Sequence, residues 1–389
     1  MAKRIRLVYT AAALIPLSVL AAACGSSGSN SGASGSASAS AKAAAMVGAA
    51  LPTSPSKTPT TITETGSTLL YPLMGSWSEA YQKAFINSSN APLVTIETGG
   101  TGSGTGITDA ATGTVDIGAS DAYLSTSDKQ TYPTMLNIAL AISAQQINYN
   151  VPGVTKPLKL DGTVLAGIYT GKITKWNDSA IAALNPGVSL PALTIVPLHR
   201  ADSSGDTFLF TSYLNAQDPS AWSSSNVGTS ISWPSVPGAL AETGNGGMVS
   251  GCGATKGCIA YIGISYLSKT QAAGLGQAEL KNGAGQYEAP TSATISAEAA
   301  ALTSKTPADE TLSMINASVP GGYPIVNYEY AVVNTKQTNG VVAEDIRAFL
   351  HWTVTTGQSS TSYLSAVDFQ PLPASVVTLS DNQIAKIGA

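Results

Sequence analysis

Charged residues are scarce in this chain: Asp, Glu, Lys and Arg make up 11% of its 389 residues, and the formal net charge is −4. Nucleic-acid binding needs a basic stripe that neutralises several phosphates, and this composition provides none. The hydrophobic fraction of 43% is nevertheless enough to build large cores. Because the chain exceeds one ordinary core, we expect two domains of about 150 residues each once terminal extensions are set aside.

Histidine and cysteine are also rare, with two and three residues. His199 and His351 are far apart in the sequence and neither has a metal-ligand spacing around it, so we expect neither a metal nor a cofactor. The sequence also lacks the nucleotide-binding motifs G-x-x-x-x-G-K-[ST] and G-x-G-x-x-G and the serine-hydrolase motif G-x-S-x-G. These absences favour a protein that is not an enzyme.

Residues 1–23 have the pattern of an export signal, and we predict that they form a signal peptide. Basic residues precede an apolar run over 7–20, and small residues lead to Cys24 in a pattern that resembles a bacterial lipoprotein signal. We therefore expect lipidation of Cys24 and a protein held at the extracytoplasmic face of the cell membrane. A plain transmembrane anchor is the alternative, but the run is short and contains Pro16. Residues 24–60, rich in Gly, Ser, Ala and Pro, predict a flexible tether.

Cys252 and Cys258 are the two remaining cysteines. An exported chain meets an oxidising compartment, so we predict a local disulfide between them that contributes about 2 kcal/mol. Free structural thiols are the alternative. A zinc site would need both distant histidines as further ligands, which we do not expect.

One local pattern occurs three times: an apolar strand, a loop of Gly, Ser and Thr, and then a helix. A helix start leaves its first N–H groups without partners and carries a partial positive charge, so such a loop favours an oxyanion. Strands that alternate with helices indicate an α/β protein, in which ligands bind beyond the carboxyl ends of parallel strands. The occurrences are a strand at 61–65 before a helix at 70–85, a strand at 93–98 before the loop 99–106, and a strand at 193–198 before a helix at 208–214.

The residues of these loops provide both donors and an acceptor for an oxyanion. An anion that still carries a proton needs an acceptor too, and Asp121, which ends the run 115–121, is our candidate. Asp202 lies two residues after Arg200 and is expected to orient its guanidinium group. Each residue also has an ordinary explanation as a helix cap or turn residue, which the sequence leaves open. The expected donors are Thr68, Ser103, Arg200, Ser204 and the backbone amides of Gly205 and Asp206.

Six longer segments carry a resemblance to a known family. They are GST at 66–68, GSG at 102–104, VDIGASD at 115–121, IYTGKITKWN at 168–177, LNPG at 184–187 and RADSSG at 200–205. Through them, residues 61–389 resemble the phosphate-binding lipoprotein of the bacterial high-affinity phosphate ABC transporter. The resemblance implies capture of inorganic phosphate outside the cytoplasmic membrane, delivery to a membrane permease, and a monomeric binding subunit.

The fold implied by this resemblance is α/β, of the periplasmic-binding-protein type. It has two lobes, each a mostly parallel sheet flanked by helices, and the chain is expected to cross between them near 142–147 and 323–326. Lobe one then combines 61–143 with 325–389, and lobe two is 144–324. The implied phosphate contacts are Thr68, the Leu69 amide, Ser103, Asp121, Arg200, Ser204, Gly205 and Asp206.

Asp206 departs from the family pattern, in which threonine is common at this position. A carboxylate cannot donate a proton from its side chain, so we hypothesise that Asp206 accepts a second P–OH proton if it faces the ion. Two other functions would use the same residues. A binding protein for sulfate or molybdate keeps the fold and changes the ligand, whereas a secreted phosphate-ester hydrolase would use Ser204 or Ser103 as nucleophile, and we rank the hydrolase last.

Overall fold

The computed structural model describes residues 50–358 and 363–388. Among these residues, no helix has the length and apolar character needed to cross a membrane. The predicted signal peptide at 1–23, the predicted lipidation site Cys24 and most of the predicted tether lie outside the described residues.

The main sheet is built from two groups of parallel strands joined by an antiparallel pair. Its strands are β1 Thr60–Gly66, β2 Val94–Glu97, β3 Ile117–Ser120, β4 Met135–Tyr149, β6 Val196–Arg200, β7 Leu240–Glu242, β8 Cys258–Gly263, β9 Gly276–Gln277, β12 Met314–Ile315 and β13 Ile325–Asn334. A smaller sheet contains β5 Lys159–Leu160, β10 Glu279–Lys281 and β11 Tyr287–Glu288.

The two parallel groups have the same internal order. In the β1 group, β1 lies between β2 and β3 and is parallel to both. In the β6 group, β6 lies between β7 and β8 and is again parallel to both. The alternation of strands and helices along the sequence predicted this parallel pairing, and the structure confirms it.

The long strands β4 and β13 join the two groups. β13 is antiparallel to β3 and to β4, and β4 is antiparallel to β8. β4 pairs with β13 as far as Ala144 and with β8 from Gln145 onward. β4 therefore spans both groups, and its partner changes within the segment 142–147.

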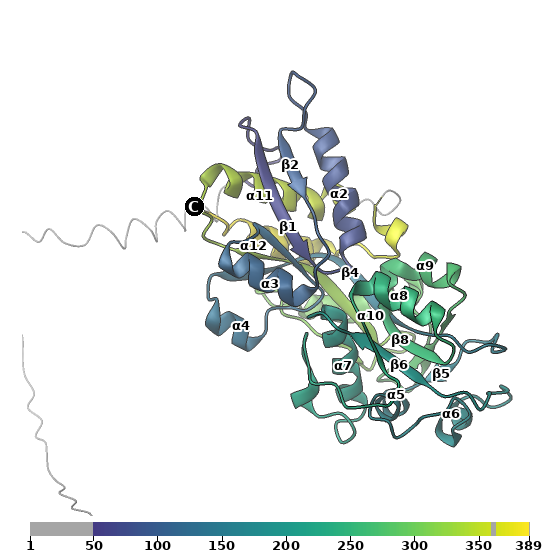
Figure 1. Cartoon of the computed structure of the whole chain (residues 1–389). Coiled ribbons are helices and arrows are strands. Elements are labelled where there is room, and N and C mark those ends of the chain that lie inside the picture. Colours follow the sequence, from purple (N-terminus) through teal and green to yellow (C-terminus); the bar gives the residue numbers. More distant parts are fainter. Residues whose placement is uncertain (1–49, 359–362, 389) are drawn as a thin grey trace, which may run out of the picture. The chain divides into compact units, whose positions relative to one another are not determined.

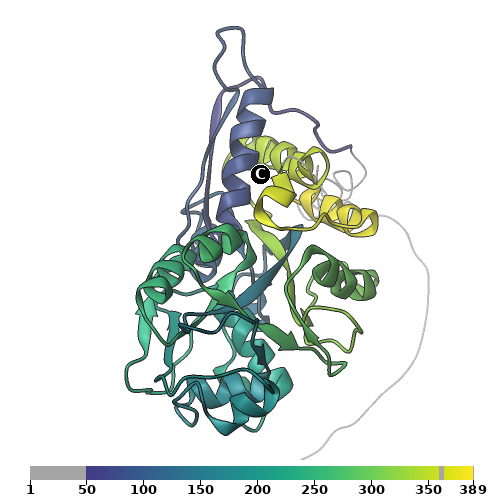
Figure 2. The same ribbon diagram turned by 90° about the vertical axis from the view of Figure 1, so that its right-hand side faces the viewer.

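Helices cover the two groups separately. α2 lies against β2 and α11 against β1, whereas α7 and α8 lie against β8, as Figure 1 and the side view in Figure 2 show. The helices are α2 Tyr71–Ala84, α3 Ser103–Thr112, α4 Thr126–Thr131, α5 Gly162–Tyr169, α6 Ser179–Leu184, α7 Gly205–Gln217, α8 Gly244–Ala254, α9 Leu267–Ala272, α10 Ser292–Leu302, α11 Gly340–Val354 and α12 Ala374–Ile384.

The first predicted strand and helix follow the spacing of apolar residues. The helix predicted at 70–85 is confirmed as α2, and the strands predicted at 61–65 and 93–98 are confirmed as β1 and β2. Apolar residues of α2 recur at steps that place them on one face, and that face is completely buried. These residues are Leu73, Met74, Trp77 and Tyr81.

The third predicted strand, at 193–198, is displaced in the structure. β6 runs from Val196 to Arg200, because the residues before it pair with another segment, in a bridge between Lys175 and Thr194. The helix that follows also begins earlier than predicted, at Gly205. Arg200 consequently ends a strand, and the loop between it and the helix is short.

Cys252 and Cys258 form a disulfide, and their Cα atoms are 5.3 Å apart. Both residues are completely buried. The predicted local bridge is therefore confirmed, and the alternative of free thiols is excluded. The bridge fixes the connection between α8 and β8, and so ties the end of α8 to β8 in the β6 group.

Candidate functional site

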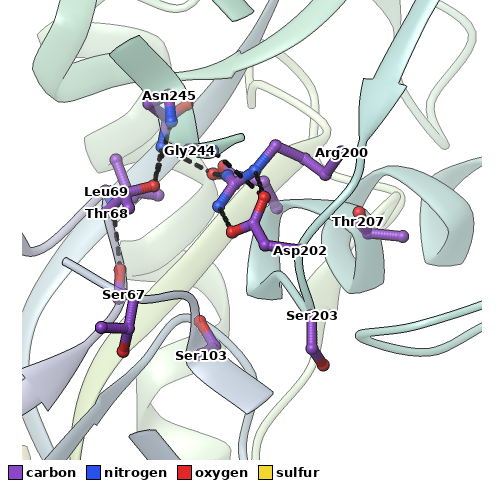
Figure 3. Close-up of polar contacts among 12 residues, drawn as sticks. Ser67, Thr68, Leu69, Ser103, Arg200, Asp202, Ser203, Thr207, Gly244 and Asn245 are labelled. Carbon is purple, nitrogen blue, oxygen red and sulfur yellow. Dashed lines mark hydrogen bonds and ion pairs between the residues drawn. The ribbon is translucent and has the colours of Figure 1, made fainter. Parts of the chain in front are cut away.

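Four helices start at the carboxyl ends of strands in the two groups. α2 follows β1, α3 follows β2, α7 follows β6 and α8 follows β7. Figure 3 shows side chains from each of these helices or the loops before them, among them Thr68, Ser103, Ser203 and Asn245. Because each helix start presents free N–H groups and partial positive charge, the arrangement favours an anion.

The start of α7 has no side-chain cap. Ser204 is the N-cap residue, but its hydroxyl caps no amide of the first turn, and within residues 50–358 and 363–388 its buried Oγ has no hydrogen-bond partner. Ser204 N donates to Thr229 O (2.8 Å), which fixes the residue. The amides of Gly205 and Asp206 lie in the first turn and have no acceptor within the helix. This loop therefore presents one hydroxyl and two amides.

Ser103, the first residue of α3, and Asp121, just after β3, lie against the start of α7. A Cβ atom on Gly205 would be 2.5 Å from Oδ2 of Asp121 and 2.6 Å from Oγ of Ser103, so only glycine fits. Asp121 N donates to Ser103 Oγ (3.2 Å). The proton of the Ser103 hydroxyl is therefore available to another acceptor.

Ser67 holds the Asp121 carboxylate in place. The Ser67 hydroxyl accepts from the amides of Leu69 (3.1 Å) and Leu70 (2.9 Å), so its own proton is directed to Oδ1 of Asp121. Burial, and after it the charge of Asp206, raises the pKa of Asp121 to about 7. Asp121 is thus an acceptor whose pKa lies near neutral pH.

Asn245 connects Thr68 of the β1 group to the β6 group. It donates to Thr68 Oγ1 from its backbone N (3.1 Å) and from Nδ2 (3.0 Å), as Figure 3 shows. These two donors occupy the lone pairs, so the hydroxyl proton of Thr68 is also available. Nδ2 of Asn245 further donates to Oδ2 of Asp206 (2.7 Å), and its Oδ1 accepts from Gly263 N (2.7 Å).

Arg200 ends β6 with its side chain 1% exposed and with its guanidinium group bound to two carboxylates. Nε donates to Oδ1 of Asp202 (2.7 Å) and Nη2 donates to Oδ2 of Asp202, as Figure 3 shows. Nη1 donates to Oδ2 of Asp206 (2.9 Å). Burial by itself lowers the pKa of Arg200, but the two carboxylates outweigh this effect and raise it. Burial by itself raises the pKa of Asp202, but the hydrogen bonds and the charge of Arg200 outweigh this effect and lower it.

Asp206 is completely buried and surrounded by protein donors. Its Oδ1 accepts from Nε2 of Gln145 (3.0 Å), and its Oδ2 accepts from Arg200 and Asn245. Burial raises the pKa of Asp206, and the charge of Arg200 opposes this. Asp206 therefore holds three neighbouring side chains in place, a role that the sequence did not predict.

The structure brings the predicted residues together at the four helix starts. One contact differs in detail, because the Leu69 amide, predicted to bind the anion, donates to Ser67. The residues that meet there are Thr68, Leu69, Ser103, Asp121, Arg200, Ser204, Gly205 and Asp206. Ser67, Gln145 and Asn245 were not predicted. A signal for Asn245 existed, since 240–247 repeats the pattern of strand, glycine loop and helix.

Proton donors outnumber acceptors at these helix starts. Three hydroxyls, one guanidinium group and several first-turn amides can donate, whereas Asp121 is a carboxylate that, among the described residues, forms no ion pair. A protonated oxyanion satisfies both kinds of group, and an oxyanion without a proton would place a lone pair against Asp121. In the part of the chain that the structure describes, no cluster of three His, Cys, Asp or Glu residues could hold a metal ion.

Comparisons with known proteins show extensive similarity. The PBP superfamily domain matches residues 52–356. The phosphate-binding protein PstS of Xylella fastidiosa is 31% identical over 317 residues, which cover 81% of this chain and 82% of that protein. PstS of Methanocaldococcus jannaschii is 31% identical over 350 residues, covering 84% and 86%. The solved structure of PfluDING, a periplasmic phosphate-binding protein bound with phosphate, has a TM-score of 0.62 and 23% identity over 84% of this chain and 99% of that chain, which shows the shared fold.

Proposed function

We propose that this chain, which belongs to the PBP superfamily and within it to the PstS phosphate-binding proteins, binds inorganic phosphate outside the cytoplasm and delivers it to an ABC permease. The observation that carries the proposal is the convergence of the starts of α2, α3 and α7 on the buried carboxylate of Asp121, with α8 joined to them through Asn245. The names of the PstS relatives and the phosphate-bound PfluDING structure support it.

The available protons at the site account for selectivity. Phosphate at neutral pH carries at least one proton, whereas sulfate carries none. Thr68, Ser103 and Ser204 donate to phosphate oxygens in this proposal, and Asp121 accepts from a P–OH group. Sulfate would offer Asp121 no proton and would bring two anions into contact, so the site favours phosphate over sulfate or molybdate.

The two strand groups are proposed to act as lobes that close around the ion. Lobe one combines 61–143 with 325–389, and lobe two is 144–324. The change of partner within β4 supports the first boundary. Polar contacts join the lobes next to the site, for example from Gly104 N to Ser203 O (3.0 Å). Such contacts, exposed to water when the lobes separate, suit an interface that opens and closes.

Binding without turnover is also part of the proposal. A serine hydrolase needs a histidine base against its nucleophile. In the described residues, His199 stacks on Trp233 and His351 contacts Asp381 (2.7 Å). Both histidines are therefore engaged away from the hydroxyls of the site, which supports a binding subunit over an enzyme.

Export is supported by the PstS relatives and by the local disulfide, which suits an oxidising compartment. To this we add two finer proposals, a lipid anchor on Cys24 and a monomeric binding subunit. Mass spectrometry of the membrane-bound protein tests the anchor, because an acylated Cys24 adds the mass of its lipid. A free, unmodified Cys24 in the mature protein would contradict it.

Equilibrium dialysis with labelled phosphate tests the function. The purified protein is expected to retain phosphate at one site per chain, and a large excess of sulfate is expected not to displace it. Strong competition by sulfate would contradict a phosphate-selective site. Release of product from a chromogenic phosphate ester would instead favour the hydrolase.

A further inference from the structure

A second buried carboxylate lies behind Asp121. Glu329, on β13, is completely buried, and Nδ2 of Asn327 donates both to its Oε1 (3.0 Å) and to the backbone O of Asp121 (3.3 Å), so the two acidic residues are neighbours. The register between β13 and β4 shifts between Glu329 and Tyr330, which marks a β-bulge or similar irregularity. Bulges beside binding sites re-aim side chains, and this irregularity lies directly at Glu329.

The two oxygens of Glu329 have different surroundings. Oε1 accepts from Oγ of Ser143 (2.5 Å) and from Nδ2 of Asn327 (3.0 Å). Oε2 is buried, and among the described residues no hydrogen-bond donor reaches it. A buried carboxylate oxygen without a donor is costly, whereas a protonated oxygen at the same place is itself a donor. The contacts therefore distinguish an acceptor oxygen, Oε1, from a donor oxygen, Oε2.

The charges around the two carboxylates do not favour a second anion. Asp206 on α7 and Arg200 on β6 act on Asp121, and their charges oppose each other. On α10, which also packs against β13, Glu298 accepts from Ala317 N. Burial, and then the negative charge of Asp121, raises the pKa of Glu329 well above its usual range. Two buried carboxylates in contact hold one proton between them.

We propose that Glu329 holds this proton and donates it to Asp121, so that Asp121 stays an ionised acceptor facing the phosphate. This inference rests on the proposed function and deepens it. Ser67 donates to Oδ1 of Asp121, and in this proposal the proton of Glu329 adds a second donor, while Oδ2 of Asp121 faces Gly205 at the start of α7. A protonated Asp121 would be one more donor and could not select for a P–OH group. Glu329 is thus a positioning residue that sets the protonation state on which selectivity depends.

Substitutions at Glu329 test the proposal with inorganic phosphate as the probe. E329L removes both the donor and the acceptor, and E329Q keeps an amide donor toward Asp121 and a carbonyl toward Ser143. By calorimetry at pH 7, we expect E329L to bind phosphate at least about tenfold more weakly than wild type, and E329Q to recover most of this loss. E310Q is the control, because Glu310 is also buried but binds Ser380 and the Ala139 amide instead.

The pH profile separates this role from a merely structural one. In the wild type, ionisation of Glu329 at high pH places a second anion behind Asp121, so affinity for phosphate falls. E329Q has no proton to lose there, so the ratio of its affinity to that of the wild type is expected to rise with pH. A ratio that falls as pH rises would contradict the proposal.

Protonation of Glu329 can also be measured without phosphate. Carbon-13 NMR of protein labelled at glutamate carboxyl carbons, with E329Q to assign the signal, is expected to show a protonated Glu329 at pH 7. An ionised Glu329, or E329Q as weak as E329L, would overturn the inference. A wild type that binds no phosphate would refute the proposed function instead, and the NMR signal would still decide the state of Glu329.

Discussion

The β1 group and the β6 group supply the site in the same way, with two helix starts each, but they differ in how their charges are arranged. In the β6 group, the buried Arg200 is bound to Asp202 and Asp206. On the β1 side, the buried carboxyl groups of Glu64 and Asp121 form no ion pair among the described residues, and burial is the main cause of their raised pKa values.

This difference separates the attraction of an anion from the selection between different oxyanions. Arg200 is fixed and largely compensated by its own carboxylates, so the helix starts of both groups supply much of the favourable field for an anion. Asp121 has hydrogen bonds and no counterion, so the proton on the ligand decides whether it is satisfied. The β6 group would therefore hold any oxyanion, and the β1 group would decide which oxyanion stays.

Removal of the cation should have the largest effect on the β6 group. R200A leaves Asp202 and Asp206 without their cation, so we expect a loss of about 3–5 kcal/mol in unfolding free energy and about a 100-fold or larger loss in phosphate affinity. Urea unfolding and calorimetry measure the two effects. R347A, which removes an arginine bound to the Ile387 carbonyl, is the control. An R200A variant as stable as wild type would show that the charges are not coupled.

A methyl group added at Gly205 should break the contact between the β6 group and the β1 group. G205A places a Cβ atom 2.5 Å from Asp121 and 2.6 Å from Ser103, so the groups cannot approach each other as in this structure. We expect at least about a 100-fold loss in phosphate affinity, near 2.7 kcal/mol, with little change in melting temperature. G246A, also in a helix start but with no atom within 4 Å of the added carbon, should bind normally. Equal affinities of G205A and G246A would contradict this contact.

The link made by Asn245 sharpens the comparison further. N245A removes the donors that orient Thr68 and Asp206 across the two groups, so phosphate affinity should fall by about 10- to 100-fold. N215A is the matched control, because Asn215 donates to the Trp222 carbonyl near the end of α7. Calorimetry on both variants checks the expectation. If N245A binds as tightly as N215A, the link does not matter for the ligand.

The unpaired carboxyl of Glu64 should make stability depend on pH. Burial raises its pKa to about 8, so the folded state holds a proton that the unfolded state loses near pH 4.5. The stabilisation is therefore complete below pH 4.5 and is lost as pH rises to about 8. E64Q should remove about 1.4 kcal/mol per pH unit from this slope, as measured by urea unfolding at several pH values. E79Q, at an exposed ion pair, is the control, and an unchanged slope in E64Q would place the ionisation elsewhere.

Local patterns predicted the parts of the fold that depend on local interactions. The periodicity of α2 and the loops around Thr68, Ser103 and Ser204 are properties of short segments, so the sequence predicted them. The position of β6 depends on the pairing of Thr194 with Lys175, a contact that a short segment cannot reveal. The sequence predicted that Asp202 orients Arg200, but it did not show that Asp206, six residues after Arg200, is bound to it as well.

The residues that were not predicted share one feature, which is that their partners come from distant segments. Gln145 and Glu329 lie in long buried strands, and each contacts a residue far away in the sequence. A polar residue inside such a strand is a signal, but it does not identify the partner. Asn245 was within reach of the sequence, because its glycine-rich helix start follows a strand, as the other three helix starts do.

A crystal structure of the protein with phosphate tests the central claim most directly. We predict one ion at the four helix starts, with the hydroxyls of Thr68, Ser103 and Ser204 and the guanidinium group of Arg200 as donors, and with a P–OH group directed at Asp121. An ion bound elsewhere, or one that does not touch Asp121, would contradict the account.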